Sequence, residues 1–223
     1  LQQMDRKQRN IMTVEDPVEY DLPGISQTQI NLRAGMTFAR GLRAILRQDP
    51  DVILIGEIRD GETAEIATQA SLTGHLVLST LHTNTAAGAI TRLQDLGVDS
   101  FLLASTVRGI ASQRLVRKLC VKCREKVPVN DFNRNLLNLP EGAELYQSRG
   151  CSECNNTGFI GRQALFELVA VSPELQTLIH ENAGELELEQ LIRRSVPSIR
   201  DAGFDLVREG VTTVEEVLRV TSV

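Results

Sequence analysis

The sequence of 223 residues contains no tryptophan, and aromatic residues of all kinds make up only 4% of it. Surfaces that bind single-stranded nucleic acid stack the bases on aromatic side chains, so this scarcity argues against such a surface. The formal net charge of -5 also gives the chain no overall attraction for a polyanion. Nucleic acid is therefore not an expected partner.

Long apolar runs are absent as well. No run approaches the ~20 residues that a helix needs to cross a bilayer, and the polar, charged residues 1–10 do not resemble a signal peptide. We therefore expect a cytoplasmic protein. With 42% hydrophobic residues, the chain is large enough for one large domain or two small ones.

Short apolar runs alternate with helical patterns in the first half of the chain. The apolar runs typical of buried strands are residues 11–14, 52–55 and 76–81. Helical spacing of apolar residues predicts helices at residues 37–48, 61–73, 85–96 and 100–118. This alternation predicts an α/β fold with a parallel sheet.

The chain changes character at Cys120. Residues 120–160 are polar and rich in turn signals, whereas a short predicted strand at 163–169 is followed by helical patterns. In this tail Thr213 and Glu216 have the spacing of a capping box, which predicts the start of a helix. We expect three domains, at residues 1–118, 119–160 and 161–223.

The four cysteines form two Cys-x2-Cys pairs, Cys120 with Cys123 and Cys151 with Cys154. Each pair can bring two thiolates to one ion, and two pairs complete a tetrahedral four-sulfur site of the kind that holds structural zinc. Four ordinary buried cysteines are the alternative, but two such pairs seldom arise by chance. Without an export signal the thiols are expected to stay reduced, which favours metal binding over disulfides.

A run of basic residues surrounds the first cysteine pair. It comprises Arg114, Arg117, Lys118, Lys122, Arg124 and Lys126. A zinc ion with four thiolates carries a formal charge of about −2, so the favoured interpretation is that these cations partly neutralise it. The alternative is a basic surface for an anionic lipid or an acidic partner.

Polar side chains follow three of the predicted strands. Glu15 and Asp16 come after the first strand with Glu19 nearby, Glu57 follows the second, and His82 follows the third. Because the carboxyl ends of parallel strands meet at the edge where ligands bind, these side chains are expected to converge. A carboxylate there can hold Mg²⁺ or orient an attacking water, and phosphoryl transfer needs both. Each group alone could be a solvated turn residue; together they indicate a site.

Three arginines, Arg40, Arg43 and Arg47, share the face of the predicted helix 37–48 that lies opposite its apolar residues. On an isolated helix a solvated face would be the simpler interpretation. Arginine, however, suits bidentate binding of phosphate, and Arg59 follows closely after the second strand. The alternative to a solvated face is therefore that these arginines bind phosphate.

Three stretches of the sequence resemble the type II secretion and type IV pilus assembly ATPases. They are residues 13–20 (TVEDPVEY, the acidic box), 46–60 (LRQDPDVILIGEIRD, the Walker B region) and 73–84 (TGHLVLSTLHTN, the histidine box). The cysteine quartet matches the metal-binding insertion of the secretion and pilus extension members, which retraction motors lack. Residues 27–31 and 36–44 look closer to the secretion branch, so pilus extension is the alternative function.

The resemblance implies a RecA-like P-loop NTPase core with a four-cysteine zinc subdomain and a helical C-terminal tail. Such a motor is a homo-hexamer that hydrolyses ATP with Mg²⁺ on the cytoplasmic side of the inner membrane. It would drive assembly of a pseudopilus by acting on the proteins of a membrane platform, and an anionic lipid is a further possible partner.

Carried over residue by residue, Glu57 is the Walker B glutamate near Mg²⁺, and His82 is the histidine that contacts phosphate. Glu15 and Glu19 are candidates for the general base. The residues implied to lie at the nucleotide or at a subunit interface are Asp16, Arg43, Arg47, Arg59 and Arg162.

The sequence departs from the family's pattern in one respect, because it contains no GxxxxGK[ST] loop to bind phosphates. We therefore expect the C-terminal part of a longer enzyme, truncated at its N-terminus and inert alone. A zinc-ribbon module that binds nucleic acid, or a non-catalytic adaptor, is the alternative of another class.

Overall fold

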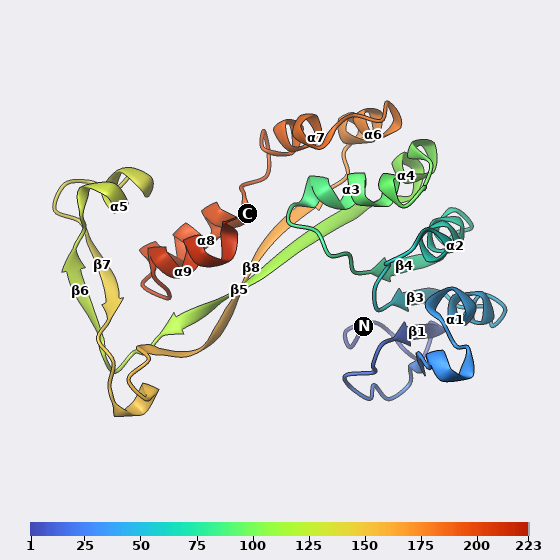
Figure 1. Ribbon diagram of the computed structural model, residues 1–223, viewed down its shortest axis with the longest axis horizontal. Coiled ribbons are helices and arrows are strands. Elements are labelled where there is room, and N and C mark those ends of the chain that lie inside the picture. The colour runs from blue at the N-terminus through green and yellow to red at the C-terminus, as the bar shows by residue number, and fades with distance from the viewer. Residues whose placement is uncertain (223) are drawn as a thin grey trace. The chain divides into compact units, whose positions relative to one another are not determined.

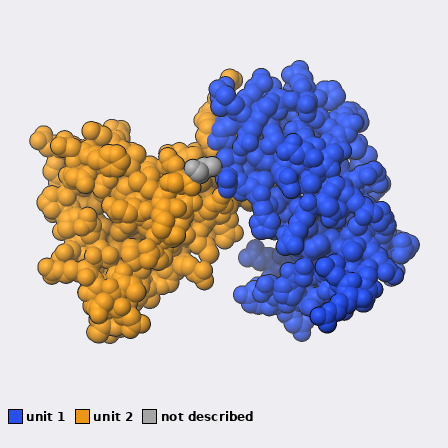
Figure 2. Space-filling view, viewed as in Figure 1, with its two compact units in different colours: residues 1–108, 171–191 blue, residues 109–170, 192–223 orange. Residues whose placement is uncertain are grey.

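The computed structural model describes residues 1–222, which form two compact units (Figure 2). Unit 1 contains residues 1–108 and 171–191, and unit 2 contains residues 109–170 together with those from 192 onward. None of the helices among residues 1–222 is both long and apolar enough to cross a membrane.

Unit 1 is built on a four-stranded sheet in which all neighbouring strands are parallel (Figure 1). Its strands, in the order β2-β1-β3-β4, are β1 (Ile11–Glu15), β2 (Ser26–Gln29), β3 (Val52–Ile55) and β4 (Leu76–Ser79). The predicted parallel α/β sheet is confirmed, although β4 ends before residue 81. Strand β2 was not predicted, because its residues are all polar and it lies at the sheet's edge.

Helices accompany this sheet along the chain. They are α1 (Phe38–Ile45), α2 (Gly61–Leu72), α3 (Ala86–Asp95), α4 (Ser100–Thr106), α6 (Pro173–His180) and α7 (Glu185–Ile192), with a short 3-10 helix, η1 (Leu32–Ala34). The central strand β3 has Val52, Ile53 and Ile55 fully buried, which fixes the position of the residues that follow it. The predicted helices at 37–48, 61–73 and 85–96 are confirmed within a few residues.

The predicted helix at 100–118 is wrong beyond Thr106. From Gly109 the chain forms β5 (Gly109–Leu119), which pairs antiparallel with β8 (Phe159–Ala170). The spacing of the apolar residues in this stretch is compatible with a strand as well as with a helix. The strand forms because this stretch pairs with β8, which is distant in the sequence. Because β5 and β8 pair, both strands belong to unit 2; the three expected domains stay a prediction.

Unit 2 combines the β5–β8 ribbon with a second antiparallel pair and two C-terminal helices (Figure 1). These elements are β6 (Arg124–Pro128), α5 (Asp131–Leu136), β7 (Glu144–Ser148), the 3-10 helix η2 (Ser152–Cys154), α8 (Ile199–Arg208) and α9 (Val214–Thr221). Its core gathers side chains from the ribbon, the hairpin and both helices, including Val116, Leu145, Leu165, Phe204 and Val217. The predicted helical tail is confirmed.

The predicted capping box at the start of α9 is half correct. The Thr213 side chain accepts a hydrogen bond from the Glu216 backbone N–H at 3.3 Å, as expected. The Glu216 carboxylate, however, accepts its hydrogen bonds from Arg117 and Arg219 instead of from the N-cap backbone. Guanidinium donors bind a carboxylate more strongly than a neutral backbone N–H does.

Candidate functional site

Glu57 lies just past the end of β3, in a loop that is held on both sides. The Gly56 N–H donates to the Val14 carbonyl oxygen of β1 at 2.8 Å, and the Ile58 N–H donates to the Thr80 carbonyl oxygen at 3.0 Å. A Cβ atom at Gly56 would come within 3.3 Å of that Val14 oxygen. Glycine therefore permits the close approach that places Glu57 beside the carboxyl end of β1.

The Glu57 carboxylate is buried and is bound by two side chains. Arg59 donates from Nε to Oε2 at 2.6 Å and contacts Oε1 through Nη2 at 2.5 Å. His82 Nε2 lies 3.1 Å from Oε2. Burial favours the neutral form, but the hydrogen bonds and charges of Arg59 and His82 outweigh it and hold the pKa of Glu57 below its ordinary value. Glu57 is thus an ionised carboxylate at the edge where ligands bind in such sheets.

The two other predicted acids, Glu15 and Glu19, have different surroundings. Glu15, the last residue of β1, accepts hydrogen bonds at Oε1 from Thr13 Oγ1 at 2.5 Å and from Gln27 Nε2 at 2.9 Å. Glu19 is exposed in the loop that follows, and among residues 1–222 no hydrogen bond or ion pair of its carboxylate is described. The structure thus places Glu15 in a defined position and leaves Glu19 in solvent.

Sequence reasoning missed the polar residues that support this edge of the sheet, Thr13, Gln27 and Thr80. Thr13 stands two residues before Glu15 on the same strand, so the period-2 geometry of a strand could have identified it. Thr80 donates to the Gly56 carbonyl oxygen at 2.6 Å, but nothing in the sequence links those two positions. Gln27 lies on β2, which the sequence did not reveal.

The predicted arginines remain on the surface. Arg43 forms an exposed ion pair with Glu62 of α2 at 2.7 Å, and Arg47 is exposed at the end of α1. Arg162 lies on β8 of unit 2, opposite Arg117 in the ribbon. Their contact with a nucleotide or another subunit stays a prediction. So does that of Asp16, which is exposed and joined to Pro17 by a cis peptide bond.

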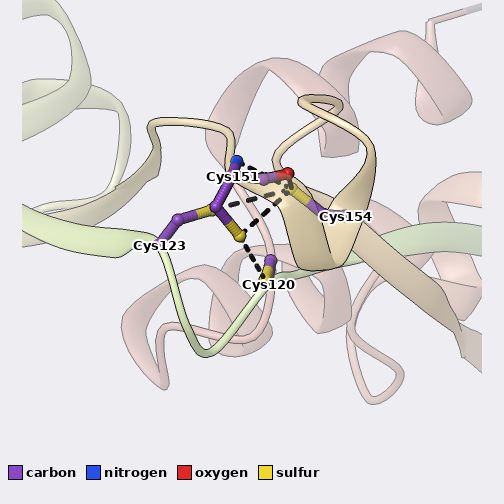
Figure 3. A group of neighbouring side chains, drawn as sticks. All are labelled: Cys120, Cys123, Cys151 and Cys154. Atoms are coloured by element: carbon purple, nitrogen blue, oxygen red, sulfur yellow. Dashed lines mark hydrogen bonds between the residues drawn. The ribbon is translucent and has the colours of Figure 1, made fainter.

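The four cysteines converge in unit 2, although the two pairs are far apart in sequence (Figure 3). All four Sγ atoms lie within 4.8 Å of one another. Three Sγ pairs are separated by 3.7 to 3.8 Å, and these join Cys120 to Cys151, Cys123 to Cys154 and Cys151 to Cys154. Tetrahedral coordination with Zn–S bonds of ~2.3 Å requires sulfur separations of about 3.8 Å. The cluster therefore fits one four-coordinate zinc ion.

Two backbone N–H groups donate hydrogen bonds to one sulfur of this cluster. Cys154 Sγ accepts hydrogen bonds from the N–H groups of Cys151 and Gly158, both at 3.2 Å. Burial raises the pKa of the Cys154 thiol, but these backbone hydrogen bonds, together with those from the Cys151 and Cys123 side chains, outweigh it and bring the pKa to about 6. For Cys123 burial prevails and raises the pKa to about 11. Donors directed at sulfur stabilise a thiolate, the form that binds metal.

Two members of the basic run bind the C-terminal segment, Arg117 at α9 and Arg124 at the loop between α8 and α9. The Arg117 guanidinium lies 4.3 Å from the centre of the Phe159 ring and donates to Glu216 at 2.8 Å. Arg124 lies 4.5 Å from the Tyr146 ring and donates to the Gly210 carbonyl oxygen at 2.6 Å. For these arginines the structure therefore shows a role that neither sequence interpretation included.

The parallel sheet and the polar edge at its carboxyl ends define a class of protein, the P-loop NTPase fold. A solved structure of the pilus retraction motor PilT with bound ADP matches the chain with a TM-score of 0.68 and 29% sequence identity, over 95% of this chain and 52% of that one. The ATPase DotB of Legionella pneumophila shows the same fold, with a TM-score of 0.65 over 94% of this chain and 50% of that one, at 21% identity.

The sequence profile of the family described as "Type II/IV secretion system protein" matches residues 1–219, and the chain belongs to this family. It is 56% identical to the "Type II secretion system ATPase E" of Vibrio cholerae and 57% identical to the "Type II secretion system protein E" of Pseudomonas aeruginosa, each over 223 residues. Both comparisons cover 99% of this chain but only 44% of the relative. The chain thus spans less than half the length of these relatives, and the family resemblance is confirmed.

Proposed function

We propose that this chain is the C-terminal part of an assembly ATPase of type II secretion and supplies one side of its ATP-hydrolysing site. The observation that carries the proposal is Glu57, an ionised carboxylate held by Arg59 and His82 at the carboxyl end of β3. Support comes from relatives over half identical that are named for type II secretion. Pilus extension is the alternative within the same class.

In this proposal Glu57 would hold Mg²⁺ or one of its waters, and the ion would neutralise charge on the transferred phosphoryl group. His82, whose side chain is 84% exposed, could turn from Glu57 to donate to the terminal phosphate. Glu15 or Glu19 would take the proton of the attacking water. No Walker A loop occurs in the 223 residues, so we expect the chain alone to hydrolyse ATP negligibly.

The partners belong to the proposal as well. A homo-hexamer would place the exposed Arg43 of α1, Arg47 in the turn after it, and Arg162 of β8 at a nucleotide or a neighbouring subunit. Proteins of an inner-membrane platform on the cytoplasmic side would transmit the motion to a pseudopilus. An anionic lipid could approach the zinc loop through the exposed side chains of Lys122 and Val121.

The test is Glu57→Gln in a full-length enzyme. The amide keeps the shape of the side chain but loses the charge, so turnover should fall by roughly 10²–10³-fold while ATP binding persists. Glu65→Gln, an exposed change on α2, is the matched control and should leave turnover unchanged. Near-normal hydrolysis by Glu57→Gln would show that Glu57 has only a structural role at the strand end.

A further inference from the structure

Gln27 of β2 has every polar atom of its side-chain amide engaged. Its Nε2 donates to Glu15 Oε1 at 2.9 Å and to the Tyr20 carbonyl oxygen at 3.0 Å. Its Oε1 accepts from the Leu22 N–H at 2.7 Å. A flipped amide would set oxygen against oxygen and N–H against N–H, so these contacts allow one orientation only. Such complete use of an amide indicates a fixed side chain.

Glu15 is held on one carboxylate oxygen and not on the other. Both of its described donors, Thr13 Oγ1 and Gln27 Nε2, bind Oε1. Thr13 and Gln27 are register partners in the parallel β1–β2 pair, so they reach Glu15 from the same face of the sheet. Among residues 1–222 no donor to Oε2 is described. The carboxylate is therefore oriented while one oxygen stays available.

The same glutamine ties down the loop that carries the acidic box. Tyr20 and Leu22, which it binds through their backbone, lie just after Glu19, the exposed alternative base. Neither Thr13 nor Gln27 is charged, so they orient Glu15 without forming an ion pair with it. This differs from Glu57, whose partners Arg59 and His82 can both carry charge.

We propose that Gln27 is a positioning residue for the ATP hydrolysis proposed above, fixing Oε1 of Glu15 so that Oε2 faces the attacking water. The inference rests on that proposed function. In the step, the water oxygen bonds to the γ-phosphorus as the bond from this phosphorus to the ADP oxygen breaks. ADP leaves with the electron pair, and Oε2 accepts the water proton and later releases it to solvent. Glu19 has no equivalent support.

The experiment compares two glutamines of β2 in a full-length enzyme. Gln27→Leu removes the donor to Glu15, and kcat should fall roughly 10–100-fold with little change in KM for ATP, because a misplaced catalytic group costs about that much. Gln29→Leu is the matched control. Gln29 is the register partner of Glu15 and also binds the loop, accepting from the Val18 N–H at 3.4 Å. Among residues 1–222, however, no hydrogen bond from its side chain to Glu15 is described, so its loss should leave kcat within about twofold.

A third variant tests the pH dependence of kcat, which a change in loop stability alone would not alter. Gln27→Glu keeps an acceptor for Leu22 but sets a second carboxylate against Glu15. Like charges at this distance favour protonation, so the acid limb of the kcat–pH profile should move to higher pH by about one unit. This profile can be measured even if Gln27→Leu fails to fold, which thermal melting would reveal.

Two results would overturn the inference: an equal fall in kcat for Gln27→Leu and Gln29→Leu, or an unmoved acid limb in Gln27→Glu. The first would mean that Gln27 only tethers the loop. Failure of the proposed function looks different, because the parent enzyme would then lack Mg²⁺-dependent ATP hydrolysis or Glu57→Gln would retain it. If the parent hydrolyses ATP and Glu57→Gln does not, while the Gln27 variants keep the kcat and pH profile of the parent, only the positioning role of Gln27 is refuted.

Discussion

Two buried glutamates, Glu57 in unit 1 and Glu216 in unit 2, each contact two basic residues, yet the two environments differ. Glu216 accepts four hydrogen bonds, from the backbone and guanidinium of Arg117 and from two nitrogens of Arg219 on its own helix. Its side chain is only 1% exposed. Glu57 is bound by Arg59 and His82, whose side chains are 63% and 84% exposed. The guanidinium groups that bind Glu216 are also partly exposed, with side-chain exposures of 48% for Arg117 and 58% for Arg219. The two sites therefore differ in the deeper burial of Glu216 and in its larger number of hydrogen bonds.

The causes of their pKa shifts differ in the same way. For Glu216 the hydrogen bond from Arg219 is the largest influence; together with those from Arg117 it overcomes burial and holds the pKa far below its ordinary value. For Glu57 burial is the largest single influence and is only outweighed by Arg59 and His82. A deeply buried carboxylate that accepts four hydrogen bonds stabilises the fold, whereas one bound in part by a largely exposed histidine can exchange that partner for a ligand. Substitutions in unit 2 should therefore affect stability, and those in unit 1 activity.

The largest effect is expected at the cysteine cluster of unit 2. Cys154→Ser removes one of four ligands, and structural zinc contributes on the order of 10–16 kcal/mol of binding free energy to folding. We expect one zinc per chain in the parent, its loss in the variant, and faster hydrogen exchange first within residues 120–160. Elemental analysis and exchange mass spectrometry check this, with the exposed Ser152→Ala as the control. A parent with well under half an equivalent of zinc, purified without chelator, would contradict it.

Glu216→Gln should have the next largest effect. The amide cannot balance two guanidinium groups, and removing one partner of a buried ion pair costs about 3 kcal/mol or more. Urea unfolding of the chain measures this change in free energy. The neighbouring Glu215→Gln is the control, because Glu215 is exposed and its substitution should change stability by less than ~0.5 kcal/mol. An equal change in unfolding free energy for Glu216→Gln and Glu215→Gln would show that the buried carboxylate contributes no more to stability than the exposed one.

Acidification should reduce the contribution of Glu216. Its pKa is lower in the folded chain than the ~4.3 of an unfolded glutamate, so the stability it provides is present above that unfolded value. As the pH falls below it, the unfolded state takes up protons first and this stability is lost. The difference in unfolding free energy between the parent and Glu216→Gln should therefore shrink between about pH 5 and pH 3. A difference that stays constant over this range would contradict the assignment.

The sequence predicted the parts of both regions that depend on short-range pattern. Apolar runs ending in Glu57 and His82 predicted strand ends, and two Cys-x2-Cys pairs predicted one cluster. It could not predict that Arg117 donates to Glu216, because these residues are 99 positions apart. It misassigned β5 for the same reason, since that strand exists through pairing with β8. Polar β2 lacked the apolar run by which the other strands of the sheet were recognised.

The smallest effect on stability is expected for Arg47→Ala in the turn after α1, although its effect on activity should be large. An exposed arginine contributes ~0–1 kcal/mol to folding, whereas an arginine that compensates phosphate charge can be worth ~10³-fold in turnover.

If Arg47 acts across a subunit interface, mixing Arg47→Ala subunits with Glu57→Gln subunits should restore some hydrolysis. One kind of interface would then combine an intact arginine with an intact glutamate, while each variant alone stays inactive. Arg33→Ala, another exposed arginine, should keep full turnover. No recovery on mixing would assign Arg47 to the site of its own subunit. Full activity of Arg47→Ala by itself would show that Arg47 is an ordinary solvated residue.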